Sequence, residues 1–415
     1  MEELIQKGIK AKKAATILAQ LSTEQKNSVL EQAAKLIIDK SDKILEANKK
    51  DLDAAHANNV KGALMDRLSL TKQRLEGIAE GLQQVASLDD PIGEVLSMNK
   101  RPNGLRIGQI RVPLGVIGII YEARPNVTAD AFALCLKTGN AVILRGGKEA
   151  INSNMAIVNI IREALQSQNV SRDAIQLVED TSRDSAVGMM KLNQYLDVLI
   201  PRGGAGLIQT VVENSSVPVL ETGVGNCHTY IDESANLKMA QSIAVNAKTH
   251  RPGVCNAMES LLIHASVADK ILPPLCEELK KLKVEIRGDD KVLQLVPFAV
   301  PAKEEDWATE YLDLILSVKI VSSLDEAIAH ITKYGSSHSE TIVTENYSNS
   351  QRFLHEVDAA AVYINASTRF TDGFMFGFGA EIGISTQKLH ARGPMGLKEL
   401  TSSKYIIYGD GQVRE

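Results

Sequence analysis

Apolar positions recur along this chain with two different rhythms, and the change of rhythm divides it into regions. Over roughly the first 90 residues they return every three or four positions, as in VLEQAAKLII at 29–38. This spacing predicts amphipathic helices that each bury one stripe. The run Ser22-Thr23-Glu24-Gln25 supplies a capping box for one of these helices. Residues 105–112 alternate apolar and polar side chains instead, which predicts a two-sided strand.

From about residue 114, short apolar runs alternate with helical segments. The first series of expected strands lies at 116–120, 141–144, 175–178, 198–200 and 217–220. A second series begins at 227–231 and continues near 261–263, 317–321, 340–343 and 359–364. Strands that alternate with helices of this length predict parallel sheets covered on both faces. The predicted fold class is therefore α/β, with two separate parallel-sheet domains.

Composition narrows the classes of protein to consider. With 415 residues, two or three domains are expected. A net charge of −5 gives no reason to expect a nucleic-acid partner, and no apolar run reaches the roughly 18 residues of a membrane span. Four scattered cysteines without a CxxC pair argue against a disulfide framework or a metal site. The N-terminus lacks a signal-peptide core, so we expect a cytoplasmic protein without a membrane partner.

Cys255 is the candidate for chemistry. It follows a Pro-Gly turn at 252–253 and precedes the apolar run 261–263, so the thiol is expected at the lip of a turn. Glu221 stands 34 positions earlier, at the end of another expected strand. A cysteine nucleophile with a carboxylate suggests acyl chemistry through a thioester. The alternative is a small buried core residue, the commoner fate of a lone cysteine.

A glycine-rich turn marks a candidate nucleotide site. Gly203 and Gly204 follow an expected strand and open a helix, where backbone N–H groups favour phosphate. The spacing is not that of the dinucleotide fingerprint, and a plain turn explains the glycines equally well.

Several motifs together resemble a known family. In order and spacing they are similar to the aldehyde dehydrogenase superfamily, and within it to the gamma-glutamyl phosphate reductase family. The resemblance covers essentially the whole chain and rests on GVIG (115–118), YEARPNVT (121–128), TGNAVIL (138–144), LETG (220–223), HRPGVCNA (250–257) and FGFGAEIGIST (376–386).

The resemblance implies NADPH-dependent reduction of L-glutamate 5-phosphate to L-glutamate 5-semialdehyde and phosphate, a step of L-proline biosynthesis. Cys255 would be the nucleophile that forms the thioester. Asn126 matches the superfamily's side-chain oxyanion donor, with the backbone N–H of Cys255 as its partner.

The resemblance also implies cofactor contacts. Glu310 matches the carboxylate that holds the nicotinamide ribose; the turn at Gly203 and Gly204 stays the candidate phosphate site that its own residues suggest. Glu221 stands where hydrolytic relatives carry a general base; here it is assigned to the cofactor, with proton management as the alternative. Arg145 and Lys148 stand where NAD-preferring relatives place a lysine and a glutamate. Because a 2′-phosphate attracts cations, they predict NADPH over NADH.

Substrate residues are harder to place. The glutamyl tail and the phosphate need basic and hydroxyl groups, and motif-rich loops offer Arg124, Ser367, Thr368, Arg369, His390 and Arg392. The kinase that makes the unstable acyl phosphate is a conceivable partner, and its docking is left open.

By resemblance, the aldehyde dehydrogenase-like fold has three parts. Residues 1–98 and 114–225 would bind NADP, 226–384 would carry the nucleophile, and 99–113 with 385–415 would form a small β oligomerisation element. Edge strands of this kind predict a homo-oligomer. Three rivals stay open: a hydrolytic aldehyde dehydrogenase that uses Glu221, a cysteine hydrolase that uses His250 with Cys255, and a non-catalytic interaction protein.

Overall fold

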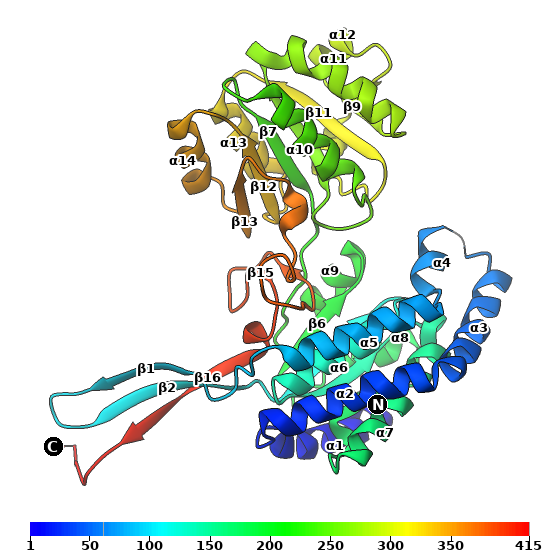
Figure 1. Ribbon diagram of the computed structural model, residues 1–415, viewed down its shortest axis with the longest axis vertical. Coiled ribbons are helices and arrows are strands. Elements are labelled where there is room, and N and C mark those ends of the chain that lie inside the picture. The colour runs from blue at the N-terminus through cyan, green and yellow to red at the C-terminus, as the bar shows by residue number, and fades with distance from the viewer. Residues whose placement is uncertain (61, 415) are drawn as a thin grey trace. The chain divides into compact units, whose positions relative to one another are not determined.

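The computed structural model describes residues 1–60 and 62–414 and divides into two compact units. The first unit comprises Met1–Glu221, Phe378–Gly383 and Met395–Glu415, and the second comprises Thr222–Gly377 and Ile384–Pro394. Each unit contains a parallel sheet covered by helices, so the predicted α/β class is confirmed (Figure 1). None of the helices in the described ranges is both long and apolar enough to cross a membrane.

The first unit opens with the predicted helical region. Its helices are α1 (Glu2–Leu18), α2 (Thr23–Asp39), α3 (Ser41–Ala57), α4 (Ala63–Leu68) and α5 (Lys72–Ser87). The capping box is confirmed, because Ser22 Oγ accepts from the Gln25 amide at 3.2 Å and Gln25 Oε1 accepts from the Ser22 amide at 3.0 Å. The apolar stripe of α2 is buried from Val29 to Ile37, Ile38 is exposed, and α2 packs on α5 and on α7 (Ile151–Ser167).

A four-stranded parallel sheet forms the centre of this unit, in the order β5-β4-β3-β6. Its strands are β3 (Val116–Tyr121), β4 (Ala141–Arg145), β5 (Ile175–Leu177) and β6 (Val198–Arg202), and the helices between or after them are α6 (Asn126–Lys137), α7, α8 (Arg183–Met190) and α9 (Ala205–Asn214), with short turns η1 (Lys148–Ala150) and η2 (Arg172–Ala174). Every residue of β3 is buried, as expected for a strand covered on both faces. The strand expected at 217–220 is only an isolated bridge from Val219 to Leu199.

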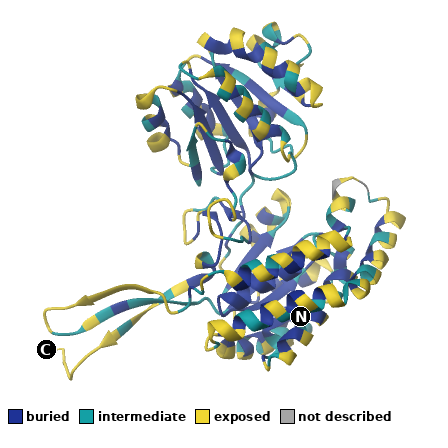
Figure 2. Ribbon diagram, in the orientation of Figure 1, coloured by how far each residue is buried: buried dark blue, intermediate teal, exposed yellow. Residues whose placement is uncertain are grey.

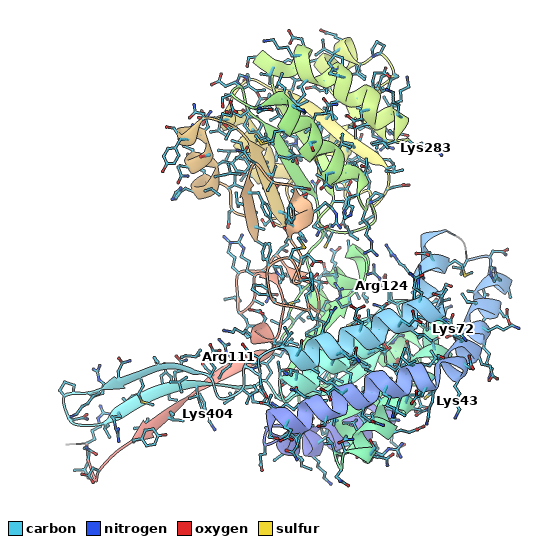
Figure 3. The ribbon with its side chains drawn as sticks, in the orientation of Figure 1. Lys43, Lys72, Arg111, Arg124, Lys283 and Lys404 are labelled. Atoms are coloured by element: carbon cyan, nitrogen blue, oxygen red, sulfur yellow. The ribbon has the colours of Figure 1, made fainter. Side chains whose placement is uncertain are left out.

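A three-stranded antiparallel ribbon leaves the first unit (Figure 1). It consists of β1 (Val95–Lys100), β2 (Arg106–Pro113) and β16 (Thr401–Tyr408), with η5 (Lys398–Leu400) before β16. The ribbon thus starts at Val95 rather than 99, and segment 385–394 is not part of it. All six residues of β1 are exposed (Figure 2), and Arg111 and Lys404 show where β2 and β16 lie in Figure 3.

The second unit contains a seven-stranded, wholly parallel sheet in the order β10-β9-β11-β8-β7-β12-β13. The strands are β7 (Cys227–Ile231), β8 (Met258–His264), β9 (Glu285–Gly288), β10 (Val300–Pro301), β11 (Ile315–Val321), β12 (Ser339–Val343) and β13 (Ala361–Ile364). The helices are α10 (Leu237–Thr249), α11 (Ala265–Lys281), α12 (Asp290–Leu295), α13 (Leu324–Tyr334) and α14 (Tyr347–Glu356). Strands β7, β8 and β12 are buried except for His264 at the end of β8 (Figure 2).

Short elements complete the second unit. They are η3 (Glu304–Ala308), η4 (Thr368–Phe370), and the small antiparallel pair β14 (Ile384–Ser385) and β15 (Gly393–Pro394). Segment 385–394, which was expected with the oligomerisation element, therefore belongs to this unit.

Candidate active site

Cys255 lies in the loop between α10 and β8 and is partly exposed, whereas Cys135, Cys227 and Cys276 are buried. Burial raises the pKa of the Cys276 thiol to about 12 and that of the Cys227 thiol well above its ordinary value. Because the thiolate is the nucleophilic form, these two buried thiols are unsuited to attack on a substrate. Position alone therefore singles out the predicted cysteine.

Two residues that come shortly before and at the start of β7, Gly225 and Cys227, hold the backbone of Cys255 in place. Its carbonyl accepts a hydrogen bond from Cys227 Sγ at 3.1 Å. Gly225 presses against the same carbonyl, since a Cβ added there would lie 1.6 Å from the Cys255 oxygen. Only glycine can occupy that position without moving the loop.

A buried row of polar side chains continues from Cys227. Cys227 Sγ is 3.6 Å from His338 Nδ1, which is 2.8 Å from Ser339 Oγ. Burial lowers the pKa of His338 to about 4, so its ring is neutral at physiological pH. The neutral Cys227 thiol and the neutral His338 ring thus support the Cys255 loop without adding a charge next to it.

A second segment, 367–371, is bound to the cysteine loop by reciprocal hydrogen bonds. Asn256 Nδ2 donates to the carbonyls of Arg369 at 3.3 Å and Thr371 at 2.8 Å. In return, Thr368 Oγ1 donates to the Asn256 carbonyl at 2.8 Å, and Ser367 Oγ accepts from the Arg369 amide at 3.3 Å. The hydroxyls of the predicted substrate residues Ser367 and Thr368 are therefore engaged in the scaffold, and the backbone of Arg369 is tied to the cysteine loop.

Glu310 is connected to Cys255 through one glycine. Its Oε1 accepts from the Gly225 amide at 2.7 Å, and Gly225 in turn touches Cys255. Burial raises the pKa of Glu310, although the Gly225 hydrogen bond opposes that shift. The structure thus brings Glu310 and Cys255, 55 positions apart in sequence, onto one loop cluster.

A buried ion pair closes the base of the cysteine loop. Lys248 at the end of α10 binds Glu259 in β8, and both side chains are fully buried. Burial lowers the pKa of Lys248 and raises the pKa of Glu259, while their mutual attraction opposes both shifts. Glu259 Oε1 also accepts from the Leu312 amide at 3.1 Å, so one carboxylate fixes both the Cys255 and the Glu310 loops.

In the second unit, these groups gather at the amino-terminal ends of parallel strands. Cys227 starts β7, Cys255 precedes β8, Glu310 precedes β11 and His338 precedes β12. Ligands of open parallel sheets more often bind at the carboxyl ends. The candidates of the first unit follow that usual rule.

Asn126 is the first residue of α6, just after β3, and its side chain is exposed. Its Nδ2 donates to Asp130 Oδ2 at 3.0 Å. Burial raises the pKa of Asp130 to about 6, and the Asn126 hydrogen bond and the charge of Arg202 partly oppose this. Since an amide carries two N–H donors, one of them remains for a ligand.

Gly203 and Gly204 lie between β6 and α9, as predicted. The N-terminus of α9 has no side-chain cap, and Gly204 is exposed there. A Cβ on Gly203 would come within 2.7 Å of both Glu122 and Leu207.

Glu221 is partly buried, two residues beyond the Val219 bridge. Arg124, labelled in Figure 3, lies in the loop before α6.

Arg145 and Lys148 differ in their contacts and exposure. Arg145 Nη2 donates to the carbonyls of Thr181 at 2.7 Å and Ser182 at 2.8 Å, so it ties β4 to the segment before α8. Lys148 is exposed in η1. Of the other basic candidates, Arg392 forms an ion pair with Asp358 at 2.7 Å, and His390 lies between β14 and β15.

Sequence reasoning missed the residues that hold the cysteine loop. Gly225, Cys227, Lys248 and Glu259 lie 30, 28, 7 and 4 positions from Cys255, and only the folded chain brings them together. One signal was present: a glutamate inside the apolar strand segment 258–263 requires a buried partner.

A family model, curated relatives and solved structures all assign this chain to the same family. The aldehyde dehydrogenase family model matches residues 2–306. The gamma-glutamyl phosphate reductase of Carboxydothermus hydrogenoformans is 62% identical over 414 residues, covering 100% of both chains. The crystal structure of the gamma-glutamyl phosphate reductase of Thermotoga maritima superposes with a TM-score of 0.97 at 52% identity, also covering 100% of both.

A more distant structure, an engineered glycolyl-CoA reductase with bound NADP+, shares the fold alone, with a TM-score of 0.70 at 16% identity over 97% of this chain and 96% of that one. The predicted aldehyde dehydrogenase-like fold is confirmed. With full-length identity of this order, the chain belongs to the aldehyde dehydrogenase family, in its branch of gamma-glutamyl phosphate reductases.

Proposed function

We propose that this chain reduces L-glutamate 5-phosphate with NADPH to L-glutamate 5-semialdehyde and phosphate, as a cytoplasmic step of L-proline biosynthesis. The observation that carries the proposal is the partly exposed Cys255, on a loop fixed by Cys227, Gly225 and Asn256. The names of the full-length relatives supply the substrate class.

The chemistry begins at the thiol. The Cys255 thiolate attacks the acyl carbon, the bond from that carbon to the phosphate oxygen breaks, and phosphate leaves with the electron pair. The product is a glutamyl thioester on Cys255. When bound, NADPH supplies the hydride that reduces this thioester. The carbon–sulfur bond then breaks, which releases the aldehyde and returns the thiolate.

Each tetrahedral stage places negative charge on the former carbonyl oxygen. We assign the backbone N–H of Cys255 and the side chain of Asn126 as donors, the latter on family resemblance. Removing one such donor typically lowers the rate by about 10²–10³. Asn126→Ala should lower kcat by that order with little change in cofactor affinity. A change confined to the substrate KM would reassign Asn126 to glutamyl binding.

The residues present suit a nicotinamide dinucleotide. The uncapped N-terminus of α9 at Gly203–Gly204 offers backbone N–H groups for phosphate, and exposed Lys148 offers a cation for a 2′-phosphate. Glu310 would accept from ribose hydroxyls, and Glu221 is kept as a cofactor contact. Arg124 and Arg369 are the proposed substrate cations, while Ser367 and Thr368 orient the loop that carries Arg369.

A coupled assay tests this function. Glutamyl phosphate, generated in place from glutamate and ATP by a glutamate 5-kinase, should drive NADPH oxidation with release of one phosphate per NADPH. Cys255→Ala should abolish turnover but bind NADPH like the wild type. Retention of more than a few per cent of the activity in that variant would exclude the thioester route.

We also propose that the ribbon mediates self-association. Its outer strands β1 and β16 each pair with β2 on one side, and they expose apolar side chains at Val95, Leu96, Met98, Tyr405, Ile407 and Tyr408. Exposed edge strands with such side chains favour pairing with a second copy. Light scattering should show a homo-oligomer, and Ile407→Glu should shift it toward the monomer. A monomeric wild type would contradict this.

A further inference from the structure

Arg369 holds a half-buried charge that its surroundings compensate only in part. The residue is half-buried in η4, and its Nε has no hydrogen-bond partner among the residues that the structure describes. Burial lowers the pKa of Arg369, the Arg251 charge lowers it further, and Asp372 and Cys255 act in the opposite direction. The Asp372 carboxylate already accepts from the amides of Phe374 at 3.0 Å and Met375 at 3.2 Å.

Arg251 brings a second cation to the same place. It is exposed, four positions before Cys255 in the same loop. Its charge lowers the pKa of Arg369, as expected for two like charges carried by neighbouring segments of one loop cluster. Like charges of this kind are stabilised when an anion binds between them.

The loop geometry fixes Arg369 relative to Cys255. Asn256, adjacent to Cys255, binds the carbonyl of Arg369 itself, and Thr368 binds back to Asn256. The Arg369 guanidinium interacts electrostatically with Cys255 as well as with Arg251. An anion between the two arginines would therefore lie next to the reacting sulfur.

We propose that Arg251 and Arg369 together bind the phosphoryl group of the acyl phosphate and, after thioester formation, the departing phosphate. This rests on the proposed function. In an acyl phosphate the phosphoryl oxygen is bonded to the very carbon that Cys255 attacks, so the phosphate must lie beside the thiol. The α-carboxylate of a glutamyl group lies at the other end of its carbon chain. Guanidinium groups match phosphate geometry with paired hydrogen bonds.

The reverse reaction separates phosphate from the rest of the substrate. With semialdehyde, NADP+ and varied phosphate, Arg369→Gln and Arg251→Gln should each raise the KM for phosphate about tenfold or more, the scale of a lost charge-assisted hydrogen bond. The KM values for semialdehyde and NADP+ should stay within about twofold. Arg369→Lys should restore part of the loss, and Arg352→Gln, an exposed arginine on α14, is the matched control.

A second readout does not need turnover. Inorganic phosphate should slow iodoacetamide labelling of Cys255 in the wild type and in Arg352→Gln, but not in Arg251→Gln, whose exposed side chain makes misfolding an unsuitable explanation. An unchanged phosphate KM with full phosphate protection would overturn the proposal. A rise confined to the semialdehyde KM would also overturn it and place the arginines on the carboxylate. A wild type that needs no phosphate to reduce NADP+ would instead refute the proposed function.

Discussion

At the scale of single residues, the placement of Cys255 depends on residues that take no part in the chemistry. Gly225 has its role because a Cβ would collide with the Cys255 carbonyl, and Cys227 because its S–H reaches that carbonyl. For a buried thiol such as Cys227, replacement by alanine is ordinarily expected to affect stability alone. The hydrogen bond at 3.1 Å now connects that residue to the placement of the nucleophile.

Lys148 and Arg145 were predicted as a pair and now predict different phenotypes. Arg145 is engaged by two carbonyls, whereas Lys148 is exposed. Lys148→Glu should weaken NADPH far more than NADH, because a carboxylate repels the doubly negative 2′-phosphate. Steady-state KM values for both cofactors check this. Arg145→Lys should mainly lower Tm. An unchanged NADPH to NADH ratio in Lys148→Glu would contradict the assignment.

At the scale of elements, the Lys248–Glu259 pair joins the end of α10 to β8 and thereby fixes the ends of the loop that carries Cys255. Through the Leu312 amide, the same carboxylate also holds the loop with Glu310. Breaking a buried pair leaves an uncompensated charge, which costs about 3–5 kcal/mol.

Lys248→Met should therefore lower Tm strongly and reduce kcat, since small displacements of a nucleophile are costly in rate. The double variant Lys248→Met/Glu259→Gln should recover much of the stability, because it removes the buried charge. Lys238→Met, exposed on the same helix, is the control for thermal unfolding and kcat. A single variant with wild-type Tm and kcat would show that the pair does not position the loop.

Sequence predicted the elements better than the connections between them. Local periodicity and the Ser22 capping box predicted the helices and most parallel strands, because each signal lies within one segment. The strand expected at 217–220 became one bridge, since its apolar run says nothing of available partners. Contacts such as that of Gly225 with Glu310 join residues far apart in the sequence, so no local pattern encodes them.

At the scale of the whole molecule, two buried histidines make the protein sensitive to acid, against the opposite contribution of the buried carboxyls of Asp130 and Glu259. Burial lowers the pKa of His330 to about 3 and that of His338 to about 4, while an unfolded histidine titrates near about 6.5. Below pH 6.5 the unfolded chain binds protons that the folded chain does not. The stability that these two histidines contribute is therefore retained above about pH 6.5 and is lost as the pH drops toward the folded pKa values.

The contribution of one histidine, His330, to the pH dependence of stability can be measured separately. Neither ring nitrogen has a partner in the described part of the chain, and the ring packs edge-on against Trp307. His330→Phe should remove about 1.4 kcal/mol of the stability lost between about pH 7.5 and 5.5. Urea unfolding at both pH values measures it, with exposed His355→Gln as control. An unaltered pH dependence in His330→Phe would assign the acid sensitivity elsewhere; Glu340, whose pKa burial raises, acts in the opposite direction.

The central claim is that the glutamyl group passes through a thioester on Cys255. Intact-protein and peptide mass spectrometry can test it after glutamyl phosphate is mixed with the enzyme in the absence of NADPH. We predict one added glutamyl group on the peptide containing Cys255, its loss when NADPH is added, and no adduct in Cys255→Ala. An adduct on another residue, or NADPH oxidation by Cys255→Ala at the wild-type rate, would contradict the account.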